Sequence, residues 1–377
     1  MKILIAPQSY KGSISAIKVA EAIKQGALNI FPDIKSLIIP VADGGDGTLE
    51  TLVESTNGTI HNSNATGPLG NSIPVIWGTL GDSKTAIIEM ARIAGLALVP
   101  QNKRNPYYTT SYGLGEIIKE ALDLGYRKFI IGIGGSATND GGAGMAQALG
   151  AKLTDENKKP IDLGGLALNE ITKIDISGID PRINESEILV ACDVNNPLCG
   201  PNGASFIYGP QKGASPEMVK TLDDALYHFG SQLIRDTGIN IMEIEGSGAA
   251  GGIGGGMVGF LDAKLKPGIE IVLDSLDFDK SLKNVDLVIT GEGQIDFQTV
   301  FSKAPIGVAK HAKKYNIPVI AICGSLGENY QDVHSHGIDA VIPIIPKPMD
   351  LKNASDNAYE LIKNTSEQIF RILKTTW

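Results

Sequence analysis

The 377-residue sequence has little of what builds a disulfide scaffold, a membrane span or a nucleic-acid surface. Its three cysteines, Cys192, Cys199 and Cys323, are too few for a disulfide framework, so we expect reduced thiols and a cytoplasmic protein. No apolar stretch approaches the roughly 18 residues of a spanning helix, so we expect no membrane partner. A net charge of −9, with no long lysine or arginine run, argues against nucleic acid as a partner.

Two common site signatures are also missing. No G-x-x-x-x-G-K-[ST] sequence occurs, which excludes a Walker A loop. Histidine is sparse, with five in the chain, and the pair His334 and His336 has no third ligand at a suitable spacing. We therefore do not expect a zinc site.

Glycine, in contrast, is abundant, with 45 residues in the chain. The densest stretch, GIGGSATNDGGAG (132–144), directly follows the apolar run KFIIGI. Glycine in such numbers costs backbone entropy, so the loop needs left-handed backbone positions or a ligand lying on the main chain. A phosphate fits best, because loop N–H groups, the Ser136 and Thr138 hydroxyls and the start of the next helix would face an anion.

Both ends of the chain alternate predicted strands and helices. The first 60 or so residues give strand, helix, strand, helix, and the last 90 or so repeat this rhythm, ending in a helix from about 354 to 374. This alternation predicts a parallel sheet with helices on both faces and ligands beyond the carboxyl ends of the strands. The middle, from about 67 to 284, is less regular, and its strands and helices include a long apolar-striped helix within 216–238.

Four glycine-rich loops carry acids or lie close to them: 42–47, 132–144, 246–256 and 290–296. Any one could be a structural turn, but four indicate the walls of one cleft. Two of them also match the dinucleotide fingerprint G-x-G-x-x-[GA]. That interpretation is weaker, because Asp140 lies inside the first loop where pyrophosphate would sit.

Acids at these loops favour a magnesium-bound nucleotide, since Mg²⁺ is usually held by one or two carboxylates together with phosphates. The candidates are Asp43, Asp46, Asp140, Asp193, Glu292 and Asp296. Asp193 follows the apolar strand EILVAC, where a partly apolar wall would favour a general base. Magnesium ligation and a structural turn remain open for it at this point.

Lys11, in the loop after the first strand, is the leading cation, with Ser9 as a neighbouring hydroxyl. Lys212, Arg104 and Lys303 also stand beside glycine or proline and could meet a carboxylate or a phosphate.

These segments together resemble the type I glycerate kinase family. The resemblance rests on APQSYKGSISA, PVADGGDGT, IEMA…GLALVP, GIGGSATNDGGAGM, DVNNPLCGPNGA…YGPQKGA, GAAGGIGGG and DLVITGEGQIDFQT…KAPIGVA. They run in the same order from the first strand to at least residue 325. Their joint occurrence is far more specific than any single loop.

The resemblance implies an α/β fold of two domains. Residues 1–66 and 284–377 would form a discontinuous Rossmann-like domain, residues 67–283 an inserted mixed α/β domain, and the active site would lie in the cleft. It further implies transfer of the γ-phosphoryl group of ATP to D-glycerate with Mg²⁺, usually at the 2-hydroxyl, giving 2-phosphoglycerate. Glycerate would be the small-molecule partner, and a homodimer is left open.

On this basis we assign roles to individual residues. Asp193 would accept the hydroxyl proton, Lys11 would act as the catalytic cation, and Asp43, Asp46 and Asp296 would hold Mg²⁺. The predicted nucleotide-binding residues are Ser9, Gly12, Gly44, Gly45, Gly134, Gly135, Ser136, Thr138, Asn139, Gly291 and Lys303.

The chain departs from the family pattern at a few positions. Gln8 and Tyr10 stand where APDSFKGS is usual, which removes one acid, and Ser302 precedes Lys303 where glycine is usual. Arg92 occupies a position that is usually small. Other activities also remain open: phosphorylation at the 3-hydroxyl, a nicotinamide-dependent dehydrogenase, and a sensor that binds ligand without turnover.

Overall fold

The structure, a computed structural model, describes residues 1–45, 47–301 and 303–375. The chain forms two compact units: unit 1 contains residues 1–43, 50–55 and 269 onward, and unit 2 contains residues 44–49 and 56–268. Unit 1 therefore combines both ends of the chain.

The sheet of unit 1 has five strands, all parallel, in the order β13-β12-β11-β1-β2. Its strands are β1 (Lys2–Pro7), β2 (Lys35–Ile38), β11 (Leu287–Ile295), β12 (Val319–Leu326) and β13 (Ala340–Pro343). In the central strands β1 and β11, Ile3, Ile5, Leu287 and Ile289 are buried, because helices cover both faces of a parallel sheet. Strands from opposite ends of the sequence thus share one core.

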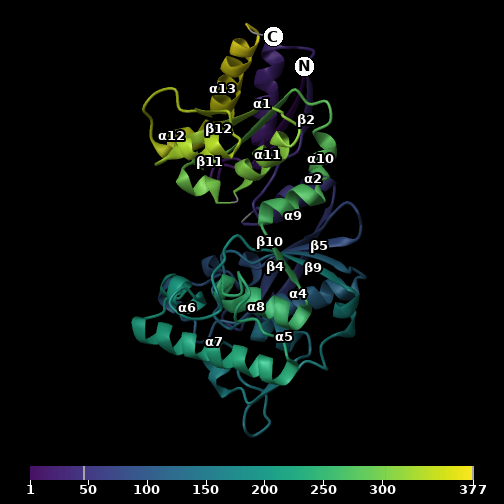
Figure 1. Cartoon of the computed structure of the whole chain (residues 1–377), viewed down its shortest axis with the longest axis vertical. Coiled ribbons are helices and arrows are strands. Elements are labelled where there is room, and N and C mark those ends of the chain that lie inside the picture. The colour runs from purple at the N-terminus through teal and green to yellow at the C-terminus, as the bar shows by residue number, and fades with distance from the viewer. Residues whose placement is uncertain (46, 302, 376–377) are drawn as a thin grey trace. The chain divides into compact units, whose positions relative to one another are not determined.

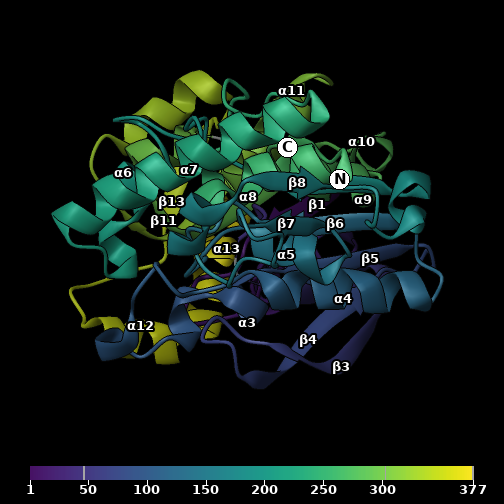
Figure 2. The same ribbon diagram turned by 90° about the horizontal axis from the view of Figure 1, so that it is seen from below.

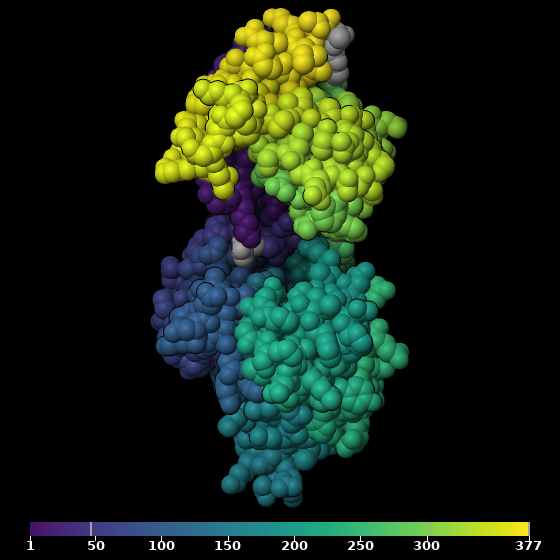
Figure 3. All heavy atoms as spheres, turned by 90° about the vertical axis from the view of Figure 1, so that its left-hand side faces the viewer, coloured from purple at the N-terminus to yellow at the C-terminus, as the bar shows by residue number. Residues whose placement is uncertain are grey.

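The helices of unit 1 include a pair formed from the two ends of the chain. They are α1 (Ala16–Ile30), most of α2 (Thr48–Thr56) and of α9 (Gly268–Ser275), α10 (Phe278–Ser281), α11 (Ala304–Lys313), α12 (Leu351–Asp356) and α13 (Ala358–Leu373). Figure 1 shows α1 and α13 side by side, and the Ser366 hydroxyl of α13 donates to the Ile23 carbonyl of α1 at 2.8 Å. In Figure 3, C-terminal residues in yellow and yellow-green form most of the visible surface of this unit.

The C-terminal segment differs from the single helix expected over 354–374. It forms two helices, α12 and α13, that meet at Asn357, whose φ of −108° and ψ of 12° interrupt the helical backbone. Asp350 fixes the start of the first helix by accepting a hydrogen bond from the Asn353 amide at 2.7 Å.

Unit 2 contains a mixed sheet of six strands in the order β10-β9-β6-β5-β4-β3. They are β3 (Thr59–Thr66), β4 (Ser72–Thr79), β5 (Thr85–Glu89), β6 (Lys128–Gly132), β9 (Glu187–Ala191) and β10 (Lys264–Lys266). The pairs from β5 to β10 are parallel, whereas β3, β4 and β5 pair antiparallel. Strand β3 belongs to this sheet, although the sequence placed the start of the inserted region at residue 67.

A separate two-stranded antiparallel sheet and several helices complete unit 2. The small sheet is β7 (Lys152–Thr154) with β8 (Lys173–Asp175), and the helices are α3 (Ala91–Ala94), α4 (Tyr112–Asp123), α5 (Ala143–Ala148), α6 (Ala204–Tyr208), α7 (Pro216–Thr237) and α8 (Ala249–Leu261). Figure 2 shows α4 running beside the β3–β4 hairpin. The apolar stripe of α7, including Leu222, Leu226 and Phe229, is buried as predicted.

The expected α/β class with parallel sheets is confirmed. Within the described residues, no helix combines the length and apolar content that crossing a membrane requires.

The close approach of α1 and α13 depends on Gly26. A Cβ atom there would meet the Ser366 Cβ at 2.7 Å and would also collide with the Lys363 carbonyl. We expect Gly26→Ala to lower the free energy of unfolding by about 1–3 kcal/mol, because overpacking outweighs the better helix propensity of alanine. Urea denaturation measures this, with the exposed Glu21→Ala as control. Stability equal to or above wild type would contradict the tight helix contact.

Candidate functional site

In unit 2, predicted site residues gather at the carboxyl ends of β6 and β9. Gly132, the last residue of β6, pairs with Ala191, the last residue of β9. Gly44 lies against both: its φ is +87°, a Cβ atom on it would meet the Ala191 Cβ at 2.6 Å, and a Cβ on Gly132 would meet the Gly44 carbonyl oxygen at 2.8 Å. The loop around Gly44, the start of the glycine-rich loop and the stretch leading to Asp193 are therefore neighbours.

The first part of the glycine-rich loop presents bare main chain to solvent. Gly134 and Gly135 are exposed, and a Cβ atom on Gly134 would have no other atom within 4 Å. Gly135 has a φ of +71°, a conformation that favours glycine. Gly45, on the neighbouring loop, is half-buried. The main chain at Gly134 and Gly135 is therefore accessible to a ligand.

The next residues of the loop turn inward. Thr138 and Asn139 have no exposed surface, and Ser136 is 5% exposed. The Asn139 side chain donates from Nδ2 to the Ser205 hydroxyl at 3.0 Å, while Thr138 Oγ1 and Asn139 Oδ1 have no partner in the described part of the chain. We expected the Ser136 and Thr138 hydroxyls to face an anion, but the structure buries them, because the loop packs into the core of unit 2.

Asp140 fixes the loop from inside. Its Oδ2 accepts hydrogen bonds from the Ser111 amide and hydroxyl, both at 2.8 Å, and its Oδ1 accepts one from the Gly142 amide at 3.2 Å. Burial raises the pKa of this carboxyl group, although these hydrogen bonds act in the opposite direction. The magnesium role considered for Asp140 does not fit, because this side chain has no exposed surface.

Lys212 fixes the same loop from the other side. The side chain is only 2% exposed, and its Nζ donates to the Ser136 hydroxyl at 2.9 Å and the Thr138 carbonyl at 2.6 Å. Burial lowers the pKa of this amine to about 7, and the negative charge of Asp140 opposes the shift. The sequence marked Lys212 only as a cation for an anionic ligand. The burial of Lys212 could not be predicted from the sequence, because nothing in GPQKG distinguishes a buried lysine from an exposed one.

Asp193 follows β9 and is exposed, whereas the sequence suggested a partly apolar wall. Its Oδ1 accepts a hydrogen bond from the Gly268 amide at 2.9 Å. This contact orients the carboxylate at the end of the strand and leaves its surface accessible.

In unit 1, the loop after β1 presents Lys11. Tyr10 is buried and donates from its hydroxyl to the Ile322 carbonyl at 2.9 Å, which anchors the loop. Lys11 and Gly12 are exposed, and Gly12 has a φ of +75°. Ser9 is half-buried. The loop thus combines an internal anchor with a cation at the surface.

Acids meet at the carboxyl end of β11. Glu292 is 7% exposed and accepts a hydrogen bond from the Thr299 hydroxyl at 2.7 Å. Burial raises the pKa of this carboxyl group to about 7. The Thr299 hydrogen bond and the positive charge of Lys303 oppose the shift, and the negative charges of Asp43 and Asp296 add to it. Asp43 and Asp296 therefore both interact electrostatically with the Glu292 carboxyl group. The sequence places Glu292 among the candidate magnesium ligands but does not assign it that role. Its burial could not be predicted, because it depends on the tertiary fold.

Other predicted residues near β11 have structural partners. Asp296 Oδ1 accepts from the Gln298 amide at 2.8 Å and Oδ2 from the Gln294 side chain at 2.8 Å, and Lys303 Nζ lies 4.0 Å from it. Gly291 is packed so closely that a Cβ atom would collide with the Ile322 carbonyl, which explains the glycine without a ligand.

The acids near β11 supply oxygen donors of the kind that Mg²⁺ binds. Within residues 1–45, 47–301 and 303–375, no three His, Cys, Asp or Glu side chains are placed to hold a metal by themselves. Mg²⁺ bound with nucleotide phosphates needs only one or two carboxylates, and the oxygen donors of Asp43 and Asp296 suit it chemically. Asp46, the third predicted ligand, and Ser302 lie outside the described residues.

For the loop 132–144, the dinucleotide interpretation does not fit the topology. After the glycine-rich loop, a dinucleotide fold needs a helix and a parallel strand that ends in an acid. Here α5 has six residues, and the next strand, β7, pairs antiparallel with β8 in a separate sheet. Asp155, the acid at about the right distance downstream of this loop, accepts turn hydrogen bonds from the Asn157 and Lys159 backbone amides.

The buried Lys212 predicts a pH-dependent stability. Between pH 7 and 10.5 the lysine of the unfolded chain keeps its proton while the buried amine has released it, so this group makes stability rise with pH, by at most about 1.4 kcal/mol per unit. Lys212→Met should remove this rise in urea denaturation from pH 7 to 9, whereas the exposed Lys220→Met should keep it. Equal pH slopes in wild type and Lys212→Met would contradict the shifted pKa.

Comparison with known proteins gives one consistent result. The model of the glycerate kinase family matches residues 3–374. A glycerate kinase of Haemophilus influenzae is 53% identical, with 99% of each chain covered. A glycerate 2-kinase of Escherichia coli is 52% identical, covering 98% of this chain and 97% of its own.

The similarity extends to a solved structure. The crystal structure of a Salmonella typhimurium LT2 protein assigned as glycerate kinase 2 superposes with a TM-score of 0.93 at 50% identity, covering 100% of this chain and 99% of that one. These matches run through every loop described above. They show that the chain belongs to the glycerate kinase family and is a kinase.

Proposed function

We propose that the protein transfers the γ-phosphoryl group of ATP to the 2-hydroxyl of D-glycerate, giving 2-phosphoglycerate and ADP. The observation that carries this proposal is the full-length match to a relative named glycerate 2-kinase. The bare backbone at Gly134 and Gly135 supports it, because main-chain N–H groups without covering side chains suit a polyphosphate.

In the proposed reaction a bond forms between the glycerate O2 atom and the γ-phosphorus, while the bond from that phosphorus to the ADP oxygen breaks. The hydroxyl proton passes to Asp193, whose exposed carboxylate is held by the Gly268 amide. Lys11 and Lys303 provide positive charge for the phosphates, since neutralising and positioning supply most of the acceleration in phosphoryl transfer.

Asp43 and Asp296 are the residues that would hold Mg²⁺, which neutralises phosphate charge when bound. Asp296 would exchange its cap hydrogen bond or the Gln294 contact for such a role. Asp46 is included on its sequence position alone. A cytoplasmic location, a homodimer and the two predicted domains remain proposals that derive from composition and the family resemblance.

The activity is tested with ATP, Mg²⁺ and D-glycerate. We expect ADP release only when glycerate is present, and phosphorus NMR of the product should show 2-phosphoglycerate. A 3-phosphate product would contradict phosphorylation at the 2-hydroxyl. ADP release that does not depend on glycerate, or no ADP release, would contradict glycerate as the acceptor.

The role of Asp193 is tested separately. Asp193→Asn keeps an oxygen that can accept from Gly268 but cannot take a proton, so we expect kcat to fall about 10²- to 10⁴-fold with an unchanged thermal midpoint. Glu187→Gln, an exposed substitution at the other end of β9, is the control and should keep wild-type kcat. Near-normal turnover in Asp193→Asn would remove this residue as the base.

A further inference from the structure

Arg104 differs from other partly buried arginines of unit 2 in having no anionic partner among the residues that the structure describes. Its Nε is buried without a hydrogen-bond partner, and over residues 1–45, 47–301 and 303–375 its guanidinium group forms no ion pair. The side chain is half-buried, so water replaces a partner only in part. A charge in this state is costly unless an anion compensates it.

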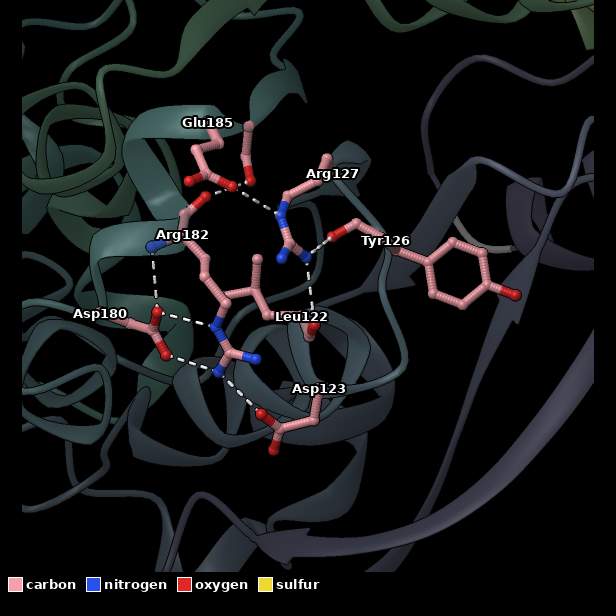
Figure 4. A network of polar contacts seen from close by, with 8 residues as sticks. Leu122, Asp123, Tyr126, Arg127, Asp180, Arg182 and Glu185 are labelled. Carbon is pink, nitrogen blue, oxygen red and sulfur yellow. Dashed lines mark hydrogen bonds and ion pairs between the residues drawn. The ribbon is translucent and has the colours of Figure 1, made fainter.

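The neighbouring arginines show how the protein usually satisfies this group. Arg182 pairs with Asp180 and Asp123, both at 2.7 Å, and Arg127 donates to the Leu122 and Tyr126 carbonyls (Figure 4). Arg92 pairs with Glu89 at 2.7 Å. Against this pattern, the unpaired guanidinium of Arg104 indicates a group kept for an anion that is not part of the protein.

Arg104 lies on a segment that packs along the glycine-rich loop. A Cβ atom on Gly213 would meet the Arg104 Cβ at 2.8 Å, and the preceding residue, Lys212, bonds the loop directly. Further along the segment, the Thr109 hydroxyl donates to the Ala137 carbonyl at 2.8 Å. Arg104 is therefore tied to the same loop that carries the exposed Gly134 and Gly135.

We infer that Arg104 binds the carboxylate of the hydroxy-acid substrate and thereby selects for an acid over a neutral alcohol. A guanidinium group suits this, because its planar N–H groups match the two oxygens of a carboxylate. Asp193, the proposed base, is carried by the same unit, and the carboxylate and 2-hydroxyl of glycerate are attached to one carbon. This inference rests on the proposed function and adds the residue that recognises the acid group.

The test compares D-glycerate with its neutral amide, glyceramide, in wild type and Arg104→Gln. Wild type should prefer glycerate, and Arg104→Gln should raise the KM for glycerate about 10- to 100-fold while the kinetics with glyceramide and the KM for ATP change little. If glyceramide is not phosphorylated, its inhibition constant is compared between wild type and Arg104→Gln instead of its kinetic constants. Arg104→Lys should recover part of the preference for glycerate, because lysine keeps the positive charge but lacks the planar N–H groups of a guanidinium.

Lys103→Gln removes one positive charge from the adjacent, exposed position and should keep the wild-type preference. The inference is overturned if Arg104→Gln discriminates between the acid and the amide as wild type does, or if it raises the KM for ATP instead. Wild-type enzyme without glycerate-dependent ADP release would overturn the proposed function rather than this assignment, so the two failures are distinguishable.

Discussion

The rest of the site in unit 2 depends on a loop held from inside by two buried ionisable side chains. Asp140 accepts hydrogen bonds from the backbone amides of Ser111 and Gly142. Lys212 donates to the Ser136 hydroxyl and the Thr138 carbonyl. Because both side chains are almost fully buried, their polar contacts are costly to lose. These contacts therefore hold the rest of the loop in place while the main chain of Gly134 and Gly135 stays exposed.

This arrangement separates two tasks within one glycine-rich sequence. The first residues after β6 offer main chain to a ligand, whereas Thr138, Asn139 and Asp140 serve the interior. A similar division occurs in unit 1, where Tyr10 anchors a loop on which Lys11 is exposed. In both units, a fixed interior side chain positions a neighbouring surface group. The entropic cost of ordering each loop therefore arises during folding rather than during binding.

The sequence predicted well those features that local pattern controls. The apolar strands and the buried stripe of α7 could be identified because their periodicity is short-range. It could not tell which side of the loop Ser136 and Thr138 would face, that Lys212 would be buried, or that Asp193 would be exposed, since contacts between distant segments decide these. The break at Asn357 was missed for a related reason: a helical pattern does not reveal a single interrupting residue.

The central claim is that the loop is formed before any ligand binds, and amide hydrogen exchange of the free protein tests it most directly. The account predicts slow exchange for the amides of residues 137–145 in the absence of ATP and glycerate, with faster exchange at Gly134. Rapid exchange throughout this segment, slowed only when ligands are added, would contradict it.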